Sequence, residues 1–171
     1  MLLISKFLSG FNKFNIFIGR IFSYFTLTMV LVTFLIVILR YGFDIGFIWL
    51  QESVRFMYAS VFLLCAAYTL GQDGHVRVDV FYLEMNKKNK AIVDFLGSVF
   101  FTIPVCMVIL LFSIDYVLNS WSQLEGSLEE RGLHAVYLLK TCIWAYAIMM
   151  IMQSLVIIFN SLNIILKSRK K

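Results

Sequence analysis

Charged side chains are scarce in this 171-residue sequence. Asp, Glu, Lys and Arg together make up 15% of the residues, whereas 61% are hydrophobic. Soluble domains usually have about 25% charged residues, and the polar surface available here is too small to cover a folded core in water. The composition therefore excludes an ordinary water-soluble domain and indicates a chain that folds in lipid.

Residue types that perform redox or hydrolytic chemistry are also few. The two histidines lie in or beside loops, so they do not supply the axial pair that a haem needs inside a four-helix bundle. Cys65, Cys106 and Cys142 each stand alone in an apolar stretch, without the paired thiols of a thiol oxidase. No nucleophile with a base, and no pair of aspartates, lies deep in an apolar stretch as in an intramembrane protease. We therefore expect no enzyme activity, no cofactor and no metal site, and we interpret the cysteines as small buried hydrophobic residues.

The formal net charge of +5 has two possible meanings, a nucleic-acid partner or a membrane topology signal. The basic residues stand in short runs beside apolar stretches and are not interleaved with exposed aromatic residues. We therefore expect no nucleic-acid partner, and membrane lipids as the surroundings of the chain.

Four apolar stretches are long enough to cross a bilayer, since a hydrocarbon core of about 30 Å requires about 20 helical residues. They cover residues 17–39, 49–70, 91–118 and 133–166. The third contains the only proline, Pro104, which removes the hydrogen bond to the carbonyl of Phe100 and predicts a kink. The fourth is longer than an upright span, so it must tilt or extend beyond the membrane. The predicted fold is one all-α membrane domain over residues 1–171, with four transmembrane helices.

Lysine and arginine gather on one side of these spans. Eleven of the fifteen basic residues lie before residue 21, between the second and third spans, or in the basic tail 167–171. Because basic residues accumulate on the cytoplasmic side of a membrane, we expect both termini in the cytoplasm.

Two further segments show helical periodicity. In residues 1–16, apolar residues recur at helical spacing on one face, and serine, lysine and asparagine occupy the other face. This pattern predicts an amphipathic helix in the cytoplasmic interface. The alternative is that this segment prolongs the first transmembrane helix. Residues 120–132, on the outer side of the membrane, predict a short surface helix that ends at Gly132.

Glu52 and Arg55 are the strongest functional candidates among the ionisable residues near the spans. At positions i and i+3 they share a helix face about one turn below Trp49, whose residue type anchors helices at the membrane interface. We interpret the pair as a salt bridge that locks this helix to a neighbouring helix or subunit; a role in moving a proton or an ion is the alternative. Deeper in the spans, Gln153 and Ser154 suit hydrogen bonds between helices rather than an ion pathway.

A series of short segments carries a family resemblance. These are RYGF at 40–43, WLQESVR at 49–55, YTL at 68–70, HVRVD at 75–79, WS at 121–122, EGS at 125–127 and LLK at 138–140. In this order they resemble the small membrane subunit of TRAP (tripartite ATP-independent periplasmic) transporters, the DctQ-like family. The four-span topology agrees with the resemblance over the whole chain.

The resemblance implies a tripartite importer in the inner membrane of bacteria. A periplasmic substrate-binding protein would capture an organic acid, and a large TRAP membrane subunit would carry it inward with sodium. The small subunit would pack against the large one as part of a static scaffold, so sodium coupling is expected in the partner and not in this chain.

The resemblance also implies roles for residues that match the motifs. Three of them look like an anchor at the outer interface: Trp49, Glu52 and Arg55. Three resemble part of a cytoplasmic loop that fixes the second helix to the third: His75, Arg77 and Asp79. Three would face the periplasm where the binding protein docks: Trp121, Glu125 and Glu129.

These observations lead to a first hypothesis and two alternatives. The first is a noncatalytic small permease subunit that scaffolds the large subunit and helps to dock the binding protein. The second is a self-contained oligomeric four-helix transporter or channel in which Glu52 is the coupling carboxylate. The third is a regulatory membrane protein whose amphipathic N-terminal segment senses the bilayer.

Overall fold

The structure, a computed structural model, describes residues 2–74 and 82–169, which form helices without any strand. The helices are α1 (Leu2–Gly42), α2 (Ile48–Gly71), α4 (Lys87–Gly97), α5 (Ile103–Phe112), α6 (Ile114–Ser122) and α7 (Val136–Arg169). A π-helical turn, η1 (Ser98–Thr102), joins α4 to α5. The predicted all-α fold is confirmed.

Four helical stretches within the described residues are long and apolar enough to cross a membrane. They are Gly10–Gly42, Ile48–Gly71, Lys87–Ser122 and Val136–Ser168. The shortest has 24 residues, which at 1.5 Å per residue makes a helix of about 36 Å. Each predicted span falls on one of these stretches, so the expectation of four membrane-spanning helices is confirmed.

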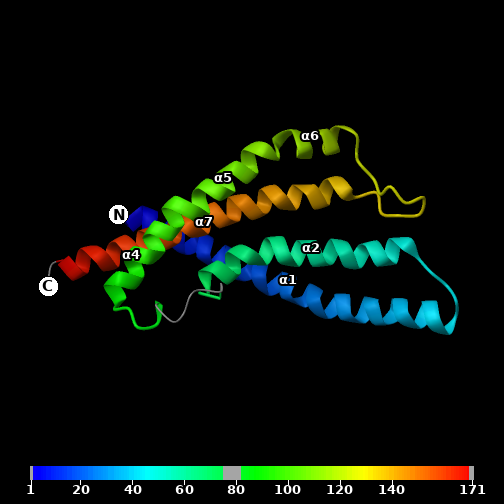
Figure 1. The fold of residues 1–171 in the computed structure, drawn as a ribbon, viewed down its shortest axis with the longest axis horizontal. Helices are drawn as coiled ribbons and strands as arrows, with labels where there is room; N and C mark the ends of the chain where they lie inside the picture. The colour runs from blue at the N-terminus through cyan, green and yellow to red at the C-terminus, as the bar shows by residue number, and fades with distance from the viewer. Residues whose placement is uncertain (1, 75–81, 170–171) are drawn as a thin grey trace.

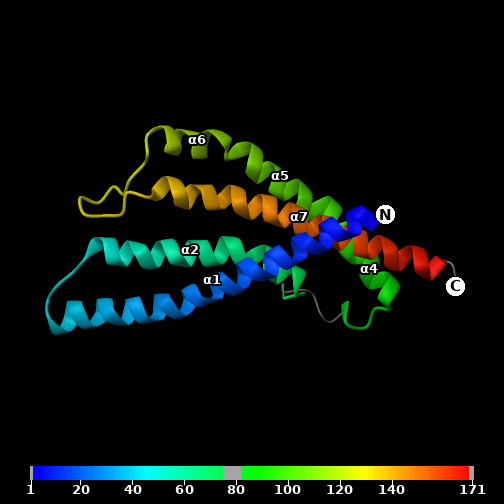
Figure 2. The same cartoon turned by 180° about the vertical axis from the view of Figure 1, so that it is seen from behind.

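The spans run alternately in opposite directions, which places both termini at one end of the bundle (Figure 1). We call this the terminal end, and we call the opposite end, which carries residues 43–47 and 123–135, the loop end. Both ribbon views show α2 between α1 and α7, and α5 and α6 on the other side of α7 (Figures 1 and 2). Towards the terminal end, α1 crosses to contact α7 as well.

The helix α7 is the centre of the bundle, because it packs against every other helical element of the described residues. The core cluster consists of Ala67 from α2, Cys106 from α5, and Ala147, Met149 and Met150 from α7. Small side chains at such contacts let helices approach closely in a membrane. Cys106 is buried as the sequence predicted, whereas Cys65 and Cys142 are half-buried.

The third span is not one regular helix. Pro104 has no N–H and its ring crowds the carbonyl four residues earlier, so the preceding turn widens into η1, where the Ile103 N–H donates to the carbonyl of Ser98. A second irregularity lies at Ser113, between α5 and α6. The disturbance predicted from Pro104 therefore takes the form of a π turn directly before the proline.

The structure does not separate residues 1–16 from the first span. Instead of a distinct amphipathic helix, α1 runs without a break from Leu2 to Gly42 and so follows the alternative, a prolonged first helix. The reason is packing: Leu8 and Asn15 are buried, and Phe11 packs against the core cluster. Asn12, which the sequence placed on the polar face, accepts a hydrogen bond from Gln153 of α7.

The predicted surface helix over 120–132 is wrong. The helix α6 ends at Ser122, and Leu124 adopts a positive φ of 44°, which an α-helix does not accommodate. The following backbone bonds to itself instead: the Ser127 N–H donates to the carbonyl of Leu133 at 3.0 Å, and the Val136 N–H donates to the carbonyl of Glu125 at 3.1 Å. Residues 123–135 therefore form a closed loop, which we call the 123–135 loop.

Candidate functional site

Glu52 lies in the second turn of α2, where the 123–135 loop folds back over the helix. Its side chain is 6% exposed, which is low for a residue type that is almost never fully buried without a partner. A buried carboxylate destabilises a fold unless hydrogen-bond donors replace the water that it loses.

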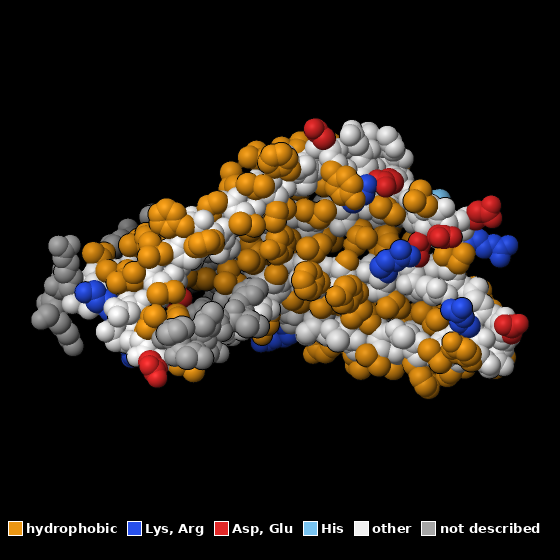
Figure 3. All heavy atoms as spheres, in the orientation of Figure 1, with side chains coloured by type: hydrophobic (Ala, Val, Ile, Leu, Met, Phe, Trp, Pro, Cys, Tyr) orange, Lys and Arg blue, Asp and Glu red, His pale blue; other side chains and the backbone are white. Residues whose placement is uncertain are grey.

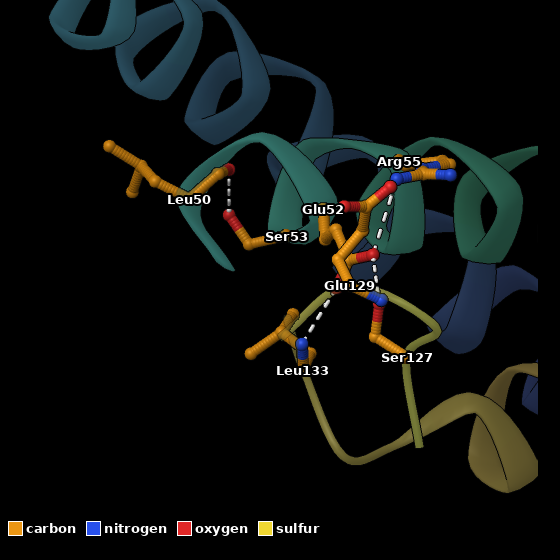
Figure 4. Close-up of polar contacts among 7 residues, drawn as sticks. All are labelled: Leu50, Glu52, Ser53, Arg55, Ser127, Glu129 and Leu133. Carbon is orange, nitrogen blue, oxygen red and sulfur yellow. Dashed lines mark hydrogen bonds and ion pairs between the residues drawn. The ribbon is translucent and has the colours of Figure 1, made fainter. Parts of the chain in front are cut away.

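Three donors meet this carboxylate (Figure 4). The Ser127 hydroxyl donates to Oε1 at 2.6 Å, the Leu133 backbone N–H donates to Oε2 at 2.6 Å, and Nη2 of Arg55 donates to Oε1 at 3.3 Å. The Ser127 hydroxyl in turn accepts from the Glu129 N–H at 3.1 Å. One carboxylate therefore ties α2 to a loop that lies 75 residues further along the chain. We call these five residues the Glu52 cluster.

Gly132 shows how closely the loop approaches the carboxylate. A Cβ atom at this position would lie 2.6 Å from Oε2 of Glu52 and 2.3 Å from the side chain of Ser127. Only a residue without a side chain fits such an approach. The glycine that the sequence placed at a helix end therefore has a different role: it lets the loop reach Glu52.

A second set of contacts at the loop end joins α6 and the loop to α7. Nε1 of Trp121 donates to the Thr141 hydroxyl at 2.8 Å, and its ring lies edge-on to Tyr137, with 4.8 Å between ring centroids. The Lys140 ammonium donates to the Glu125 carboxylate, and this hydrogen bond lowers the pKa of Glu125. Trp121 and Glu125 thus have partners inside the chain.

The structure brings the predicted anchor and docking residues to the same end of the bundle. Glu52 and Arg55 form the predicted pair, and Trp49 lies half-exposed near the start of α2, where its ring is 6.0 Å from that of Phe47. On the loop, Glu129 is exposed. The three residues predicted for the loop at the other end, His75, Arg77 and Asp79, lie outside the described residues.

Sequence reasoning missed the partners of Glu52. Ser127 was noted only as part of a family motif, and the other short contact comes from a backbone N–H of Leu133, which leaves no mark in residue type. Sequence reasoning had instead considered a neighbouring helix or subunit as the partner. The interaction lies within one chain and joins a helix to a loop.

Gln153, which the sequence suggested for hydrogen bonds between helices, forms a polar layer nearer the terminal end, but its partners on α1 were not foreseen. Gln153 of α7 is buried, accepts from Nδ2 of Asn15 at 2.8 Å, and donates to Oδ1 of Asn12 at 3.4 Å. A signal was present, since Asn12 and Asn15 are three positions apart and share one face of the helix. Gly71 leaves room for the Gln153 side chain, because a Cβ atom at Gly71 would lie 2.6 Å from Nε2 of Gln153.

The described polar contacts of Glu52 and Gln153 join segments of the same chain. The Glu52 carboxylate already accepts two short hydrogen bonds from its own loop, and Gln153 is occupied by two asparagines. Among the described residues, no group of three or more His, Cys, Asp or Glu side chains is placed to hold a metal ion. The described polar groups therefore connect helices and loops to one another.

Comparison with known proteins gives one match. The family model described as "Tripartite ATP-independent periplasmic transporters, DctQ component" matches residues 29–164, a stretch that includes all of α2, the 123–135 loop and most of α7. No curated protein and no solved structure matches the chain. Because the match covers most of the sequence, including Glu52 and its loop partners, this chain belongs to the DctQ family of TRAP transporter components.

Proposed function

We propose that this chain is the noncatalytic small permease subunit of a sodium-coupled TRAP importer of organic acids. In this proposal it scaffolds the large membrane subunit, which carries the acid and sodium, and it helps to dock the periplasmic binding protein. The observation that carries the proposal is family membership combined with spans that have no charged residue along most of their length.

The uncharged parts of the spans are long. They cover residues 21–39, 56–70, 95–114 and 141–166. Transporters commonly bind substrate and coupling ions near the bilayer midplane through charged residues or broken helices in matching positions. Here two buried polar residues of α7 have partners within the chain, since Gln153 bonds to Asn15 and the Ser154 hydroxyl donates to the carbonyl of Met150. These facts support a subunit that depends on a partner for substrate and ion sites.

The surface of the bundle supports a scaffolding role. Hydrophobic side chains cover most of the middle of the face drawn in Figure 3. Large apolar residues along α1 and α5, including Leu27, Phe34, Val108 and Phe112, are exposed in the isolated chain. In a membrane, such faces pack against lipid or against another helix. We propose that the large subunit covers part of this surface.

The loop end supports a docking role. The Glu52 cluster holds the 123–135 loop against α2, and Leu128 and Glu129 at the exposed part of that loop project away from the bundle. With the basic terminal end in the cytoplasm of a bacterium, this loop lies in the periplasm at the inner membrane. Trp121, Glu125 and Glu129 then stand on the side that a binding protein reaches.

The alternative, a self-contained transporter that uses Glu52, has less support. A coupling carboxylate must bind and release its ion during each cycle, whereas the Glu52 carboxylate accepts two hydrogen bonds of 2.6 Å from its own loop. Its position near the start of α2 is also far from the middle of the span. Both facts favour the anchor role.

Reconstitution into liposomes tests the proposal. The complete set is this chain, a large TRAP membrane subunit and a periplasmic binding protein from the same organism, with an inward sodium gradient and radiolabelled organic acids as probes. We expect uptake with the complete set and loss of uptake when any protein is omitted. Uptake by this chain alone would contradict the proposal, and so would full uptake by the other two proteins without it.

A further inference from the structure

A lateral groove of about 570 Å³ runs between α1 and α2. Its walls come from one stripe of each helix, with Val30 and Thr33 on α1 and Val54, Arg55 and Tyr58 on α2. Spacings of three and four residues place each stripe on one helix face, so the groove follows the crease between the two antiparallel helices. Short β-branched side chains in both walls leave the crease hollow.

Arg55 supplies the charge in this mostly apolar groove. Its side chain is 68% exposed and projects from α2 beyond the Glu52 carboxylate, on the side away from Ser127 and Leu133 (Figure 4). A guanidinium has five N–H donors, and one of them makes the 3.3 Å contact with Glu52. The other N–H groups remain for a ligand, and Arg55 borders both this groove and the hollow beside the 123–135 loop.

The depth of Arg55 matches the boundary between hydrocarbon and headgroups. It lies about 10 Å along α2 from the first residue of the helix, and Trp49 near that start is typical of the membrane interface. A long arginine side chain reaches from such a depth towards the headgroups. Gln51, four residues before Arg55 on the same face, adds an amide donor towards the same end of the groove.

We propose that this groove binds one phospholipid molecule, with its phosphodiester on Arg55 and an acyl chain along the crease between α1 and α2. A guanidinium binds phosphate oxygens through paired N–H donors, and the apolar walls below it accommodate hydrocarbon. An acidic residue of a partner protein would satisfy Arg55 too, but it would leave the hollow crease unfilled. The lipid would stiffen the packing of α1, whose loop-end half contacts α2 along a single stripe.

Native mass spectrometry of the full chain tests this inference. The protein is purified in mild detergent, incubated either with phosphatidylglycerol or with a diacyl glycolipid that lacks phosphate, and scored for bound lipid. We expect the wild type to retain one phosphatidylglycerol and little glycolipid. Arg55→Gln should lower phosphatidylglycerol retention about tenfold, the scale of losing a charged hydrogen bond.

Two further variants test whether lipid is lost from the groove itself or through a general effect of mutation. Arg40→Gln removes another exposed arginine near the loop end but outside the groove, so it should retain lipid like the wild type. Val30→Phe fills the crease while Arg55 stays intact, so it should also lose the lipid. Circular dichroism and gel filtration confirm that each variant is folded.

Two results would overturn the inference. One is equal retention of phosphatidylglycerol by the wild type, Arg55→Gln and Val30→Phe. The other is unchanged lipid binding by Arg55→Gln together with release of the large subunit, which would assign Arg55 to an acidic residue of that partner. The lipid measurement needs no other subunit, so its outcome is separate from that of the transport experiment.

Discussion

At the scale of single residues, hydrogen bonding explains how the Glu52 carboxylate can be buried. Removing a carboxylate from water costs several kcal/mol unless donors compensate, and here Ser127 and Leu133 provide two short hydrogen bonds. Arg55 contributes a longer contact through a mostly exposed side chain. Exposed ion pairs contribute little to stability. The loop contacts, and not the salt bridge, therefore hold Glu52.

Glu52→Gln should loosen the 123–135 loop and leave the bundle folded. An amide has one oxygen in place of two, so either Ser127 or Leu133 loses its acceptor, at about 1 kcal/mol of local stability. Hydrogen–deuterium exchange should show faster exchange of backbone amides in the 123–135 loop. Glu130→Gln, at an exposed position of the same loop, is the control. Unchanged exchange throughout this loop in Glu52→Gln would contradict this account.

Gly132→Ala should lower the melting temperature of the detergent-solubilised chain. The added methyl group would overlap the side chains of Ser127 and Glu52, and overpacking of this kind costs about 1–3 kcal/mol. Gly46→Ala is a matched control at the same end, because no atom lies within 4 Å of its Cβ position. Equal melting temperatures for the two variants would show that the loop has room at Gly132.

Glu125 gives stability a pH dependence. Its pKa is lowered by the hydrogen bond from Lys140, and a carboxyl group with a lower pKa in the folded state stabilises that state above its unfolded pKa. This stabilisation disappears as the pH falls through the lowered folded-state value. The melting temperature of the wild type should therefore exceed that of Glu125→Gln near neutral pH, and the gap should close in acid. A gap that persists in acid strong enough to protonate the carboxyl group in both states would refute the ionic origin of the effect.

At the scale of helices, hydropathy alone predicted the four spans, because a run of about 20 apolar residues matches the length of a helix that crosses a bilayer. It failed where contacts between distant segments decide the structure. The 123–135 loop has helical periodicity, yet its backbone bonds to itself and to Glu52. In the same way, Asn12 and Asn15 resemble a water-facing stripe until α7 supplies Gln153. The pairing of Glu52 with Arg55 was predictable from their spacing, whereas the loop partners of Glu52 were not.

The polar layer should hold the first and last spans together. Gln153→Leu removes both hydrogen bonds to α1 and leaves two asparagine side chains unsatisfied, which should destabilise the bundle by about 1–2 kcal/mol. Unfolding in increasing sodium dodecyl sulfate measures this change. Thr28→Val is the control, because the Thr28 hydroxyl is exposed and donates only to the backbone of Tyr24. A loss no greater than that of the control would show that the layer contributes nothing to stability.

At the scale of the whole molecule, the two ends of the bundle differ in charge and in chain connections. The terminal end carries most of the lysine and arginine, and the loop end carries the Glu52 cluster. This asymmetry supports a single orientation in the membrane. It also separates the parts of the chain that would meet cytoplasmic and periplasmic partners.

Cysteine labelling in intact cells checks the orientation. Leu128→Cys places a thiol at a fully exposed position of the 123–135 loop, and Ser168→Cys places one near the end of α7. A membrane-impermeant maleimide should label the first in intact cells and the second only after lysis. The wild type, whose three cysteines lie within the spans, is the background control. The reverse labelling pattern would invert the proposed topology.

The central position of α7 has a consequence for biogenesis. The ribosome completes α7 after the other three spans, yet α7 supplies Ala147, Met149 and Met150 to the core. The 123–135 loop that covers Glu52 also emerges just before it. During synthesis, the first three spans therefore enter the bilayer without their shared packing partner and with an uncovered carboxylate. Insertion of α7 is therefore the step that brings the first and third spans onto a shared core.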